Sequence, residues 1–255
     1  MNISFASKAE IKELLRMKKS GQFVFFEGFH TLEEALRANY LPDLILLKDE
    51  EMLESAFFQD KIFTEICKNL KFTIVKEEGI KRLSSERSPV GIVSFGRPPE
   101  PKEFGPSPWI YLDRIQDPGN LGTILRSSLA FGCGGVFLSE DSCSVYNSKV
   151  IRSSAGAIFK VPFKRKGFNE IINEMKNDLE IFSFSPRATT LFFNCEFKKR
   201  TLLVFGNEGS GIGDDIIGTS NKTVCIPTQS VESLNVAMSV NIVLSFLYFK
   251  NLITS

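Results

Sequence analysis

The residues best suited to chemistry lie in three short stretches rich in Gly, Pro, Asn and Ser. They cover residues 114–122, 206–211 and 227–235, and each follows a run expected to form a strand. Glycine and proline favour tight turns, and glycine lets the backbone approach a ligand closely. Ordinary turn formation explains any one of these stretches taken singly. Three of them on one edge of one sheet would favour a binding site.

The remaining chemistry-bearing side chains exclude several reaction classes. His30 is the single histidine, so a multi-histidine metal centre is excluded. No Gly-x-Ser-x-Gly nucleophile elbow accompanies it, and we interpret His30 as a structural or surface residue. The five cysteines form no Cys-x-x-Cys pair, which predicts reduced thiols in a cytoplasmic protein; they are Cys67, Cys133, Cys143, Cys195 and Cys225.

The composition is that of a folded globular chain. Of the 255 residues, 43% are hydrophobic and 24% are charged. No apolar run is long enough to span a membrane, and the first ten residues do not read as a secretion signal. The net charge of +1 does not by itself indicate a nucleic-acid partner, although nearly equal numbers of basic and acidic residues can still form charged patches.

A proline-rich linker over residues 98–108 predicts a boundary between two domains, 1–97 and 109–255. In the second domain, apolar runs without alternation are separated by helical patterns, which predicts an α/β fold with a parallel sheet covered on both faces. The expected strands are 109–113, 136–139, 161–163, 180–184, 202–205 and 224–226. The expected helices are 121–131, 148–158, 169–177 and 234–251. Ligands of such sheets bind at the carboxyl ends of the strands.

The first domain is expected to be a small α/β unit. Its predicted strands are 23–26, 44–47, 72–75 and 90–95. Its predicted helices lie within residues 8–18, 32–39 and 55–69, and Thr31 is a candidate cap for the second of them.

A nicotinamide-binding domain is not expected. The late glycine stretch reads Gly206-x-x-Gly209-x-Gly211, whereas the dinucleotide fingerprint is Gly-x-Gly-x-x-Gly after the first strand. Position and spacing both differ.

Three ordered motifs resemble those of the SpoU-like RNA ribose methyltransferases of the SPOUT superfamily. Asp113-x-x-x-Asp117-Pro118-Gly119-Asn120-Leu121-Gly122-x-x-x-Arg126 resembles their first motif. Residues 205–211, Phe-Gly-Asn-Glu-Gly-Ser-Gly, resemble the second. Ile226-Pro227 with Ser233-Leu234-Asn235-Val236 resembles the third, and residues 149–157 match a stretch between the first two.

The resemblance extends to the first domain and has one departure. Residues 26–30 and 88–92 resemble landmarks of a substrate-binding domain that is similar to a small ribosomal protein binding kinked RNA. The third motif usually has a glycine before Ser-Leu-Asn. Residues 228–232 contain none, and this loop is one residue shorter, so the cofactor pocket could be reshaped there.

The resemblance implies a deep trefoil knot, with residues 202–251 threaded through an earlier loop. It implies S-adenosyl-L-methionine bound in the knot by backbone around Gly206, Ile226 and Leu234, with Ser233 and Gly211 in the same cofactor-binding set. It also implies a homodimer formed through the catalytic domains. The final helix is expected to contribute apolar surface from Val236, Val240, Val243, Leu244 and Leu247.

The implied reaction methylates a ribose 2′-hydroxyl without a metal, because the sulfonium already activates the methyl group. Arg126 is expected to contact the hydroxyl or a phosphate and to stabilise negative charge. A role as general base stays open, although a guanidinium is ordinarily protonated. Asn120 would orient Arg126 or the nucleotide, or cap its helix, and Glu208 would anchor Arg126 or order the glycine loop. Ser233 and Asn235 would cap the final helix or shape the pocket.

RNA is the expected partner, and ribosomal RNA rather than transfer RNA the expected substrate. Three basic clusters are then candidates for an RNA track: Lys12, Arg16, Lys18 and Lys19; Lys160, Lys164, Arg165 and Lys166; and Lys198, Lys199 and Arg200. The alternatives are a transfer RNA ribose 2′-O-methyltransferase and a catalytically silent RNA-binding or ribosome-assembly factor on the same fold. No membrane or metal partner is expected.

Overall fold

Short hydrophobic runs form the strands of two sheets, and each sheet belongs to one unit of the chain. A computed structural model describes residues 2–175 and 178–250, so the expected helix ends at Asn177 and Asn251 lie outside the described residues. Unit 1 contains residues 1–100 and 146–159, and unit 2 contains residues 101–145 and 160–255. The first change of unit falls inside the expected linker. Segment 146–159, in contrast, interrupts the expected second domain.

Unit 1 is built around a mixed sheet with strand order β1-β4-β3-β5-β2. Strands β1, β4 and β3 are parallel, and β5 is antiparallel to both β3 and β2. The strand bounds are β1 Asn2–Phe5, β2 Val24–Glu27, β3 Leu44–Leu47, β4 Lys71–Ile74 and β5 Ile92–Gly96.

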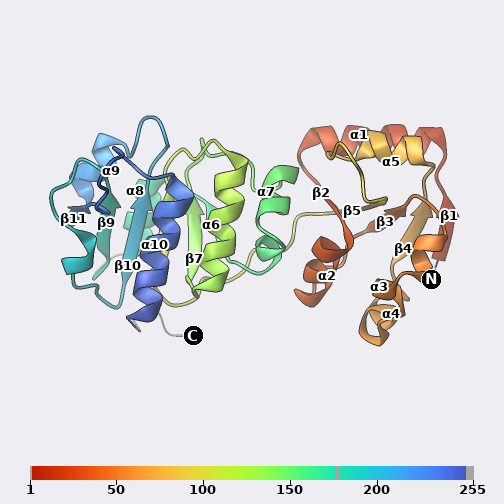
Figure 1. Cartoon of the computed structure of the whole chain (residues 1–255), viewed down its shortest axis with the longest axis horizontal. Coiled ribbons are helices and arrows are strands. Elements are labelled where there is room, and N and C mark those ends of the chain that lie inside the picture. The colour runs from red at the N-terminus through yellow and green to blue at the C-terminus, as the bar shows by residue number, and fades with distance from the viewer. Residues whose placement is uncertain (1, 176–177, 251–255) are drawn as a thin grey trace. The chain divides into compact units, whose positions relative to one another are not determined.

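Helices cover both faces of this sheet (Figure 1). On one face, α1 (Lys8–Ser20) and α5 (Glu77–Leu83) enclose a buried cluster that includes Leu14, Leu46 and Ile80. On the other face lie α2 (Phe29–Arg37), α3 (Ala56–Gln59) and α4 (Lys61–Cys67), and a 3-10 turn, η1, spans Glu51–Glu54.

Segment 146–159 packs with unit 1 through aromatic contacts. It contains α7 (Ser148–Ser153) and the 3-10 turn η2 (Ala157–Phe159). The Phe159 ring stacks on Tyr40 with centroids 4.8 Å apart and meets Phe26 edge-on at 5.2 Å. The single helix expected over residues 148–158 is therefore wrong. The chain leaves the helix because residues 155 and 156 both take left-handed φ values, 47° and 83°.

Unit 2 contains a fully parallel sheet with strand order β11-β9-β10-β6-β7-β8. Its strands are β6 Trp109–Leu112, β7 Gly135–Leu138, β8 Phe163–Arg165, β9 Glu180–Phe184, β10 Thr201–Phe205 and β11 Lys222–Val224. The expected strands 161–163 and 224–226 are each displaced by two residues. The parallel sheet itself is confirmed.

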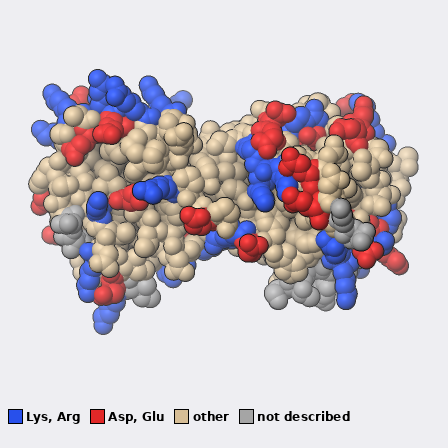
Figure 2. Space-filling model, turned by 180° about the vertical axis from the view of Figure 1, so that it is seen from behind, with Lys and Arg blue, Asp and Glu red and all other residues tan. Residues whose placement is uncertain are grey.

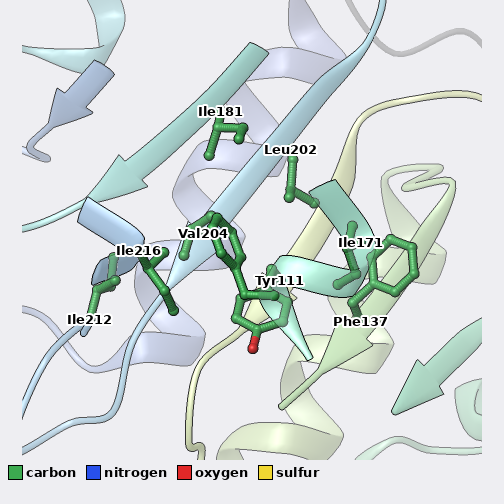
Figure 3. Close-up of a cluster of buried hydrophobic side chains, with 9 residues drawn as sticks. Tyr111, Phe137, Ile171, Ile181, Leu202, Val204, Ile212 and Ile216 are labelled. Atoms are coloured by element: carbon green, nitrogen blue, oxygen red, sulfur yellow. The ribbon is translucent and has the colours of Figure 1, made fainter. Parts of the chain in front are cut away.

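Both faces of this sheet are covered, as predicted. On one face, α8 (Phe168–Met175) and α9 (Asp214–Thr219) pack on a buried cluster of sheet residues that includes Tyr111, Leu202 and Val204 (Figure 3). On the other face lie α6 (Pro118–Ala130) and α10 (Val236–Phe249), side by side in Figure 1. A 3-10 turn, η3 (Phe192–Asn194), places Phe192 against Phe246 of α10 at 5.2 Å.

Several local expectations are corrected. Thr31 lies inside α2, which begins after Gly28, and so does not cap it. The helix expected over residues 55–69 is interrupted at Asp60, whose extended backbone separates α3 from α4. The five apolar residues of α10 expected to form an interface are buried within the chain, so they belong to the core: Val236, Val240, Val243, Leu244 and Leu247.

Candidate functional site

The three polar loops lie at one edge of the unit 2 sheet. They follow β6, β10 and β11, whose carboxyl ends point the same way because the sheet is parallel. Strand β10 is paired with β6, and the N–H of Asp113 donates to the carbonyl of Phe205 at 2.8 Å. The chain runs from β6 to β7 on one side and returns to β10 on the other, so the first two loops meet at the topological switch point.

An arginine that the sequence motifs did not single out joins the first loop to the glycine loop. The Arg114 guanidinium donates to both carboxylate oxygens of Asp113, at 3.1 and 2.8 Å, and to the carbonyl of Gly211 at 3.3 Å. The buried Asp113 carboxylate also accepts from the N–H of Gly213 at 3.0 Å. The hydrogen bonds to Asp113 raise the pKa of Arg114. A charged pair directly after a buried strand was the available signal.

The glycine loop is a tight turn held by Asn207. Its backbone exchanges hydrogen bonds with Gly211 at 3.2 and 2.9 Å, and its Oδ1 accepts from the N–H groups of Gly209 and Ser210 at 2.8 and 3.0 Å. A Cβ on Gly206 would lie 2.3 Å from the carbonyl carbon of Gly211, so only glycine fits there. Asn207 Nδ2 donates to the carbonyl of Arg114 at 2.8 Å, which ties the turn to the first loop.

A line of side-chain hydrogen bonds connects all three loops. Asn120 Nδ2 donates to Glu208 Oε1 at 2.5 Å, and Asn235 Nδ2 donates to Asn120 Oδ1 at 2.9 Å. Asn235 also caps α10, because its Oδ1 accepts from the N–H groups of Ala237 and Met238 at 2.9 and 3.3 Å. These three side chains, which we call the motif bridge, come from segments up to 115 residues apart in the chain.

The motif bridge corrects two expectations. Asn120 does not cap α6: Asp117 does, with its Oδ1 accepting from the Asn120 N–H at 2.9 Å and Pro118 in the first turn. The helix accordingly begins at Pro118 rather than at Leu121. Glu208 binds Asn120 rather than anchoring Arg126.

Arg126 stands apart from the motif bridge, on the solvent-exposed face of α6. At about 100° per residue, its side chain leaves the helix about a third of a turn away from that of Asn120. Within residues 2–175 and 178–250, its guanidinium has no hydrogen bond or ion pair. The structure therefore leaves this cation available to a ligand.

The residues expected to hold the cofactor lie at the same edge and offer mainly backbone groups. Gly206, Gly211, Ile226 and Leu234 are half-buried, whereas Ser233 is exposed. Among the described residues, the backbone of 226–234 makes no hydrogen bond to another backbone group. A Cβ on Gly211 would meet nothing within 4 Å. Apart from the Val231 carbonyl, which accepts from Thr228 Oγ1 at 2.7 Å, the backbone groups of this stretch fit a ligand such as S-adenosyl-L-methionine that is held by the main chain. Gly211 lines the space, because its own N–H and carbonyl are bound within the glycine loop.

The two basic clusters of unit 2 prove to be partly internal. The Arg165 guanidinium donates to four backbone carbonyls in the loop after β7, and the buried Lys166 ammonium pairs with Glu174. Arg200 donates to the carbonyl of Met175 at 3.0 Å and lies over the Trp109 ring. These cations stabilise the fold, and Lys164, Lys198 and Lys199 are the members that remain exposed.

The described residues also bear on metal binding, membrane spanning and disulfide formation. The part of the chain that the structure describes contains no group of three or more residues suited to a metal ion, and no helix in it is long and apolar enough to cross a bilayer. All five cysteines are free. His30 is exposed on α2 of unit 1, whereas the three loops belong to unit 2.

Comparison with known proteins gives consistent matches. Residues 107–245 match the model of the SpoU rRNA Methylase family. A relative from Synechocystis sp., named an uncharacterized tRNA/rRNA methyltransferase, is 30% identical, with 78% of this chain and 82% of the relative covered. The 23S rRNA (guanosine(2553)-2′-O)-methyltransferase RlmP of Bacillus subtilis is 26% identical, with coverage of 84% and 83%.

Solved structures match over almost the whole chain. A crystal structure of an RNA 2′-O ribose methyltransferase has a TM-score of 0.78 and 26% identity, covering 99% of this chain and 100% of its own. The SpoU methyltransferase AviRb from Streptomyces viridochromogenes, crystallised with AdoMet, has a TM-score of 0.80 at 20% identity, with coverage of 96% and 99%. At that identity the second match concerns the fold alone.

Proposed function

Because this chain belongs to the SpoU rRNA Methylase family and is thereby an S-adenosyl-L-methionine-dependent RNA 2′-O-ribose methyltransferase, we propose that its substrate is ribosomal RNA. The family description and the RlmP relative support ribosomal RNA over transfer RNA. The motif bridge carries the assignment of the site, since it ties the three family motifs to one edge of the sheet.

The cofactor supplies a methyl group already activated by the sulfonium. The chain's own backbone at Gly206, Ile226 and Leu234 would hold it, with Gly211 lining the space and Ser233 at the rim. Asn235, fixed as the α10 cap, and Asn120 hold the second and third loops at a set distance from the first. This positioning favours transfer because a reacting pair held in the right geometry avoids much of the entropy cost of meeting.

Arg126 would act on the substrate oxygen. A ribose hydroxyl gains negative charge as it attacks, and a guanidinium aimed at it stabilises that charge. Arg126 is exposed and free of internal partners among the described residues, which supports this assignment. We assign it charge stabilisation rather than proton abstraction, because a guanidinium is ordinarily protonated.

A homodimer through the α6 and α10 face would place Arg126 beside the subunit interface. Exposed apolar side chains occur on both of these neighbouring helices, and the rings of Phe131 and Tyr248 pack at 5.8 Å. Exposed apolar patches of this kind mark interaction sites. The members are Leu129, Met238, Tyr248 and Phe249, the last two exposed by 43% and 77%.

Three further parts of the proposal follow from the family resemblance. The chain from Leu202 onward would be threaded as a trefoil knot, for which the central place of β10 between β9 and β6 is supporting evidence. The 1–97 domain would bind RNA, and the 109–255 domain would carry catalysis. A cytoplasmic location fits a ribosomal RNA substrate.

Methyl transfer to RNA tests the proposal. The purified chain is incubated with methyl-labelled S-adenosyl-L-methionine and deproteinised ribosomal RNA or transfer RNA, and labelled sites are mapped as 2′-O-methyl nucleotides. Label in ribosomal RNA that Arg126→Ala abolishes, with Lys102→Ala unaffected, supports the assignment. Label in transfer RNA alone would contradict the substrate, and no cofactor binding would indicate the silent RNA-binding alternative.

A further inference from the structure

Resting on this proposed function, we propose that the outer face of α1 is an RNA docking surface that binds the phosphates of a single-stranded segment. Four cations form the surface, which we call the α1 stripe: Lys8, Lys12, Arg16 and Lys19. All four are exposed. Neither the motif loops nor the landmark stretches of unit 1 contain any of these residues.

The α1 stripe is straight and rigid. At about 100° per residue, its four side chains leave the helix within a sector of about 80°, along about 16 Å of helix axis. The helix that presents them is fixed at both ends. At the start, Ser7 and Glu10 form a reciprocal capping box, and at the end Gly21 adopts a left-handed φ of 67°.

The cations of the stripe are not held in ion pairs by the described part of the protein. None of the four cations has an ion pair with another residue in the described ranges. Of the two carboxylates on α1, Glu10 is occupied by the capping box, where it accepts from the Ser7 N–H at 2.7 Å. Figure 2 shows Lys and Arg side chains gathered over α1, at the upper left. A chain with a net charge of only +1 thus concentrates free cations on one helix face.

Lys18 does not belong to this surface. Its ammonium donates to the carbonyl of Leu83 and, at 2.8 Å, to Ser85 Oγ, and burial lowers its pKa. The basic cluster expected from the sequence, which included Lys18, therefore divides into one structural lysine and exposed cations.

A hollow beside the stripe suits an unpaired base. It measures about 610 Å³ and is lined by Lys12, Arg16, Glu13, Gln22 and Phe23, among others. An aromatic ring next to cations is the combination that binds single strands, because bases stack on the ring while phosphates meet the charges. The Glu13 carboxylate can accept hydrogen bonds from base edges, and the Gln22 amide can both donate and accept them.

The α1 stripe is better suited to bind RNA than the landmark stretches are. Residues 26–30 and 88–92, which the family resemblance marks, contain no lysine or arginine. The Glu27 carboxylate accepts from Ser84 Oγ and from the Ser85 N–H instead. Because phosphate neutralisation supplies much of the affinity for RNA, the electrostatic contact of unit 1 is assigned to the α1 stripe.

The test compares the full-length double variant K12Q/R16Q with K61Q/K71Q. The control pair is also exposed on unit 1 but lies outside the stripe, at the starts of α4 and β4. Binding to a short single-stranded RNA of mixed sequence is measured over a range of salt concentrations, alongside methyl transfer to ribosomal RNA. Thermal unfolding checks that each variant folds, and K8Q/K19Q gives an independent second pair.

We expect K12Q/R16Q to bind RNA about tenfold more weakly at low salt. We also expect the slope of log affinity against log salt to fall by about 1.4, since each lost phosphate contact contributes about 0.7 for a single strand. The KM for RNA should rise, whereas kcat and cofactor affinity should not change, and K61Q/K71Q should match the wild type.

Two results overturn the proposal, and they are distinguishable. If K12Q/R16Q binds RNA with wild-type affinity and slope while the wild type methylates RNA, the stripe serves another partner, such as an acidic protein, and the proposed function stands. If the wild type neither binds nor methylates RNA, the proposed function fails together with the stripe.

Discussion

Replacing Arg114 by glutamine measures what the contact between the first loop and the glycine loop contributes to stability. The change removes two charge-assisted hydrogen bonds to Asp113 and one to the carbonyl of Gly211. Glutamine keeps a Cβ at this position, where φ is 56°, so the cost of the left-handed backbone stays the same in both proteins. The effect therefore reports on the side-chain contacts.

The expected magnitude follows from burial. Asp113 is 5% exposed, and removing one partner of a buried ion pair costs about 3–5 kcal/mol. The Arg114 side chain is 37% exposed, so water already screens part of the interaction. The hydrogen bond from the Gly213 N–H also remains. We expect the free energy of unfolding to fall by about 2 kcal/mol.

Urea unfolding of four proteins tests this value: wild type, Arg114→Gln, Asp113→Asn and the double variant. The double variant removes both charges, so its loss should be smaller than the sum of the single losses, by about 1–2 kcal/mol. Cofactor affinity should fall in Arg114→Gln, because Gly211 is released from one of its contacts. Losses that add within about 0.5 kcal/mol would refute the coupling.

Four further predictions concern separate parts of the molecule. Arg126→Ala should lower the rate of methyl transfer a few hundredfold, which corresponds to a rise of about 3–4 kcal/mol in the activation free energy. Cofactor affinity measured by calorimetry should be nearly unchanged, and normal turnover would refute the role of Arg126. Asn120→Ala should weaken cofactor binding and lower the free energy of unfolding by about 1 kcal/mol, because two side-chain hydrogen bonds are lost. An unchanged dissociation constant for the cofactor would contradict the bridging role. Phe249→Asp should convert a dimer to a monomer in light scattering, whereas a wild-type monomer at micromolar concentration would exclude the proposed interface. Burial raises the pKa of Cys133 to about 12, so its thiolate is scarce at pH 8; iodoacetamide should label the half-buried Cys143, Cys195 and Cys225 before the buried Cys133 in the native protein, and equal labelling of Cys133 would show that the core opens.

The parts of the fold that are local in sequence were predictable. The buried strand over residues 109–112 and the helix after it follow from hydrophobic runs and turn residues. In contrast, β1 and α5 were not predicted, since each is short and mixes polar with apolar residues. Tertiary pairing makes them regular: β1 lies parallel to β4, and α5 packs against α1. Propensity alone does not contain that information.

Only part of the candidate site was predictable from the sequence. The residue types and motif order of Asn120, Glu208 and Asn235 indicate candidate site residues, but their mutual contacts do not follow from spacing. Glu208 lies 88 residues from Asn120, and Asn235 lies 115 residues from it. The return of β10 to the side of β6 brings Glu208 to Asn120, and the packing of α10 against α6 brings Asn235 to it. Arg114 was missed because its signal, a charged pair directly after a strand, becomes informative only once Asp113 is known to be buried.

The proposed mechanism needs no histidine. Its cations are divided between two tasks: Arg114 and Arg165 are bound internally and hold loops at the carboxyl edge, whereas the Arg126 guanidinium has no hydrogen bond or ion pair with the described residues. A cation already paired with a buried carboxylate cannot turn towards a reacting oxygen without leaving that carboxylate unpaired. Arg126 is free of this constraint, so its guanidinium can stabilise the negative charge that we expect to develop on the ribose oxygen. Under the proposed assignment, rate enhancement depends on loops held in place rather than on a titrating base, and variants of the motif bridge should change the rate without changing the shape of its pH profile.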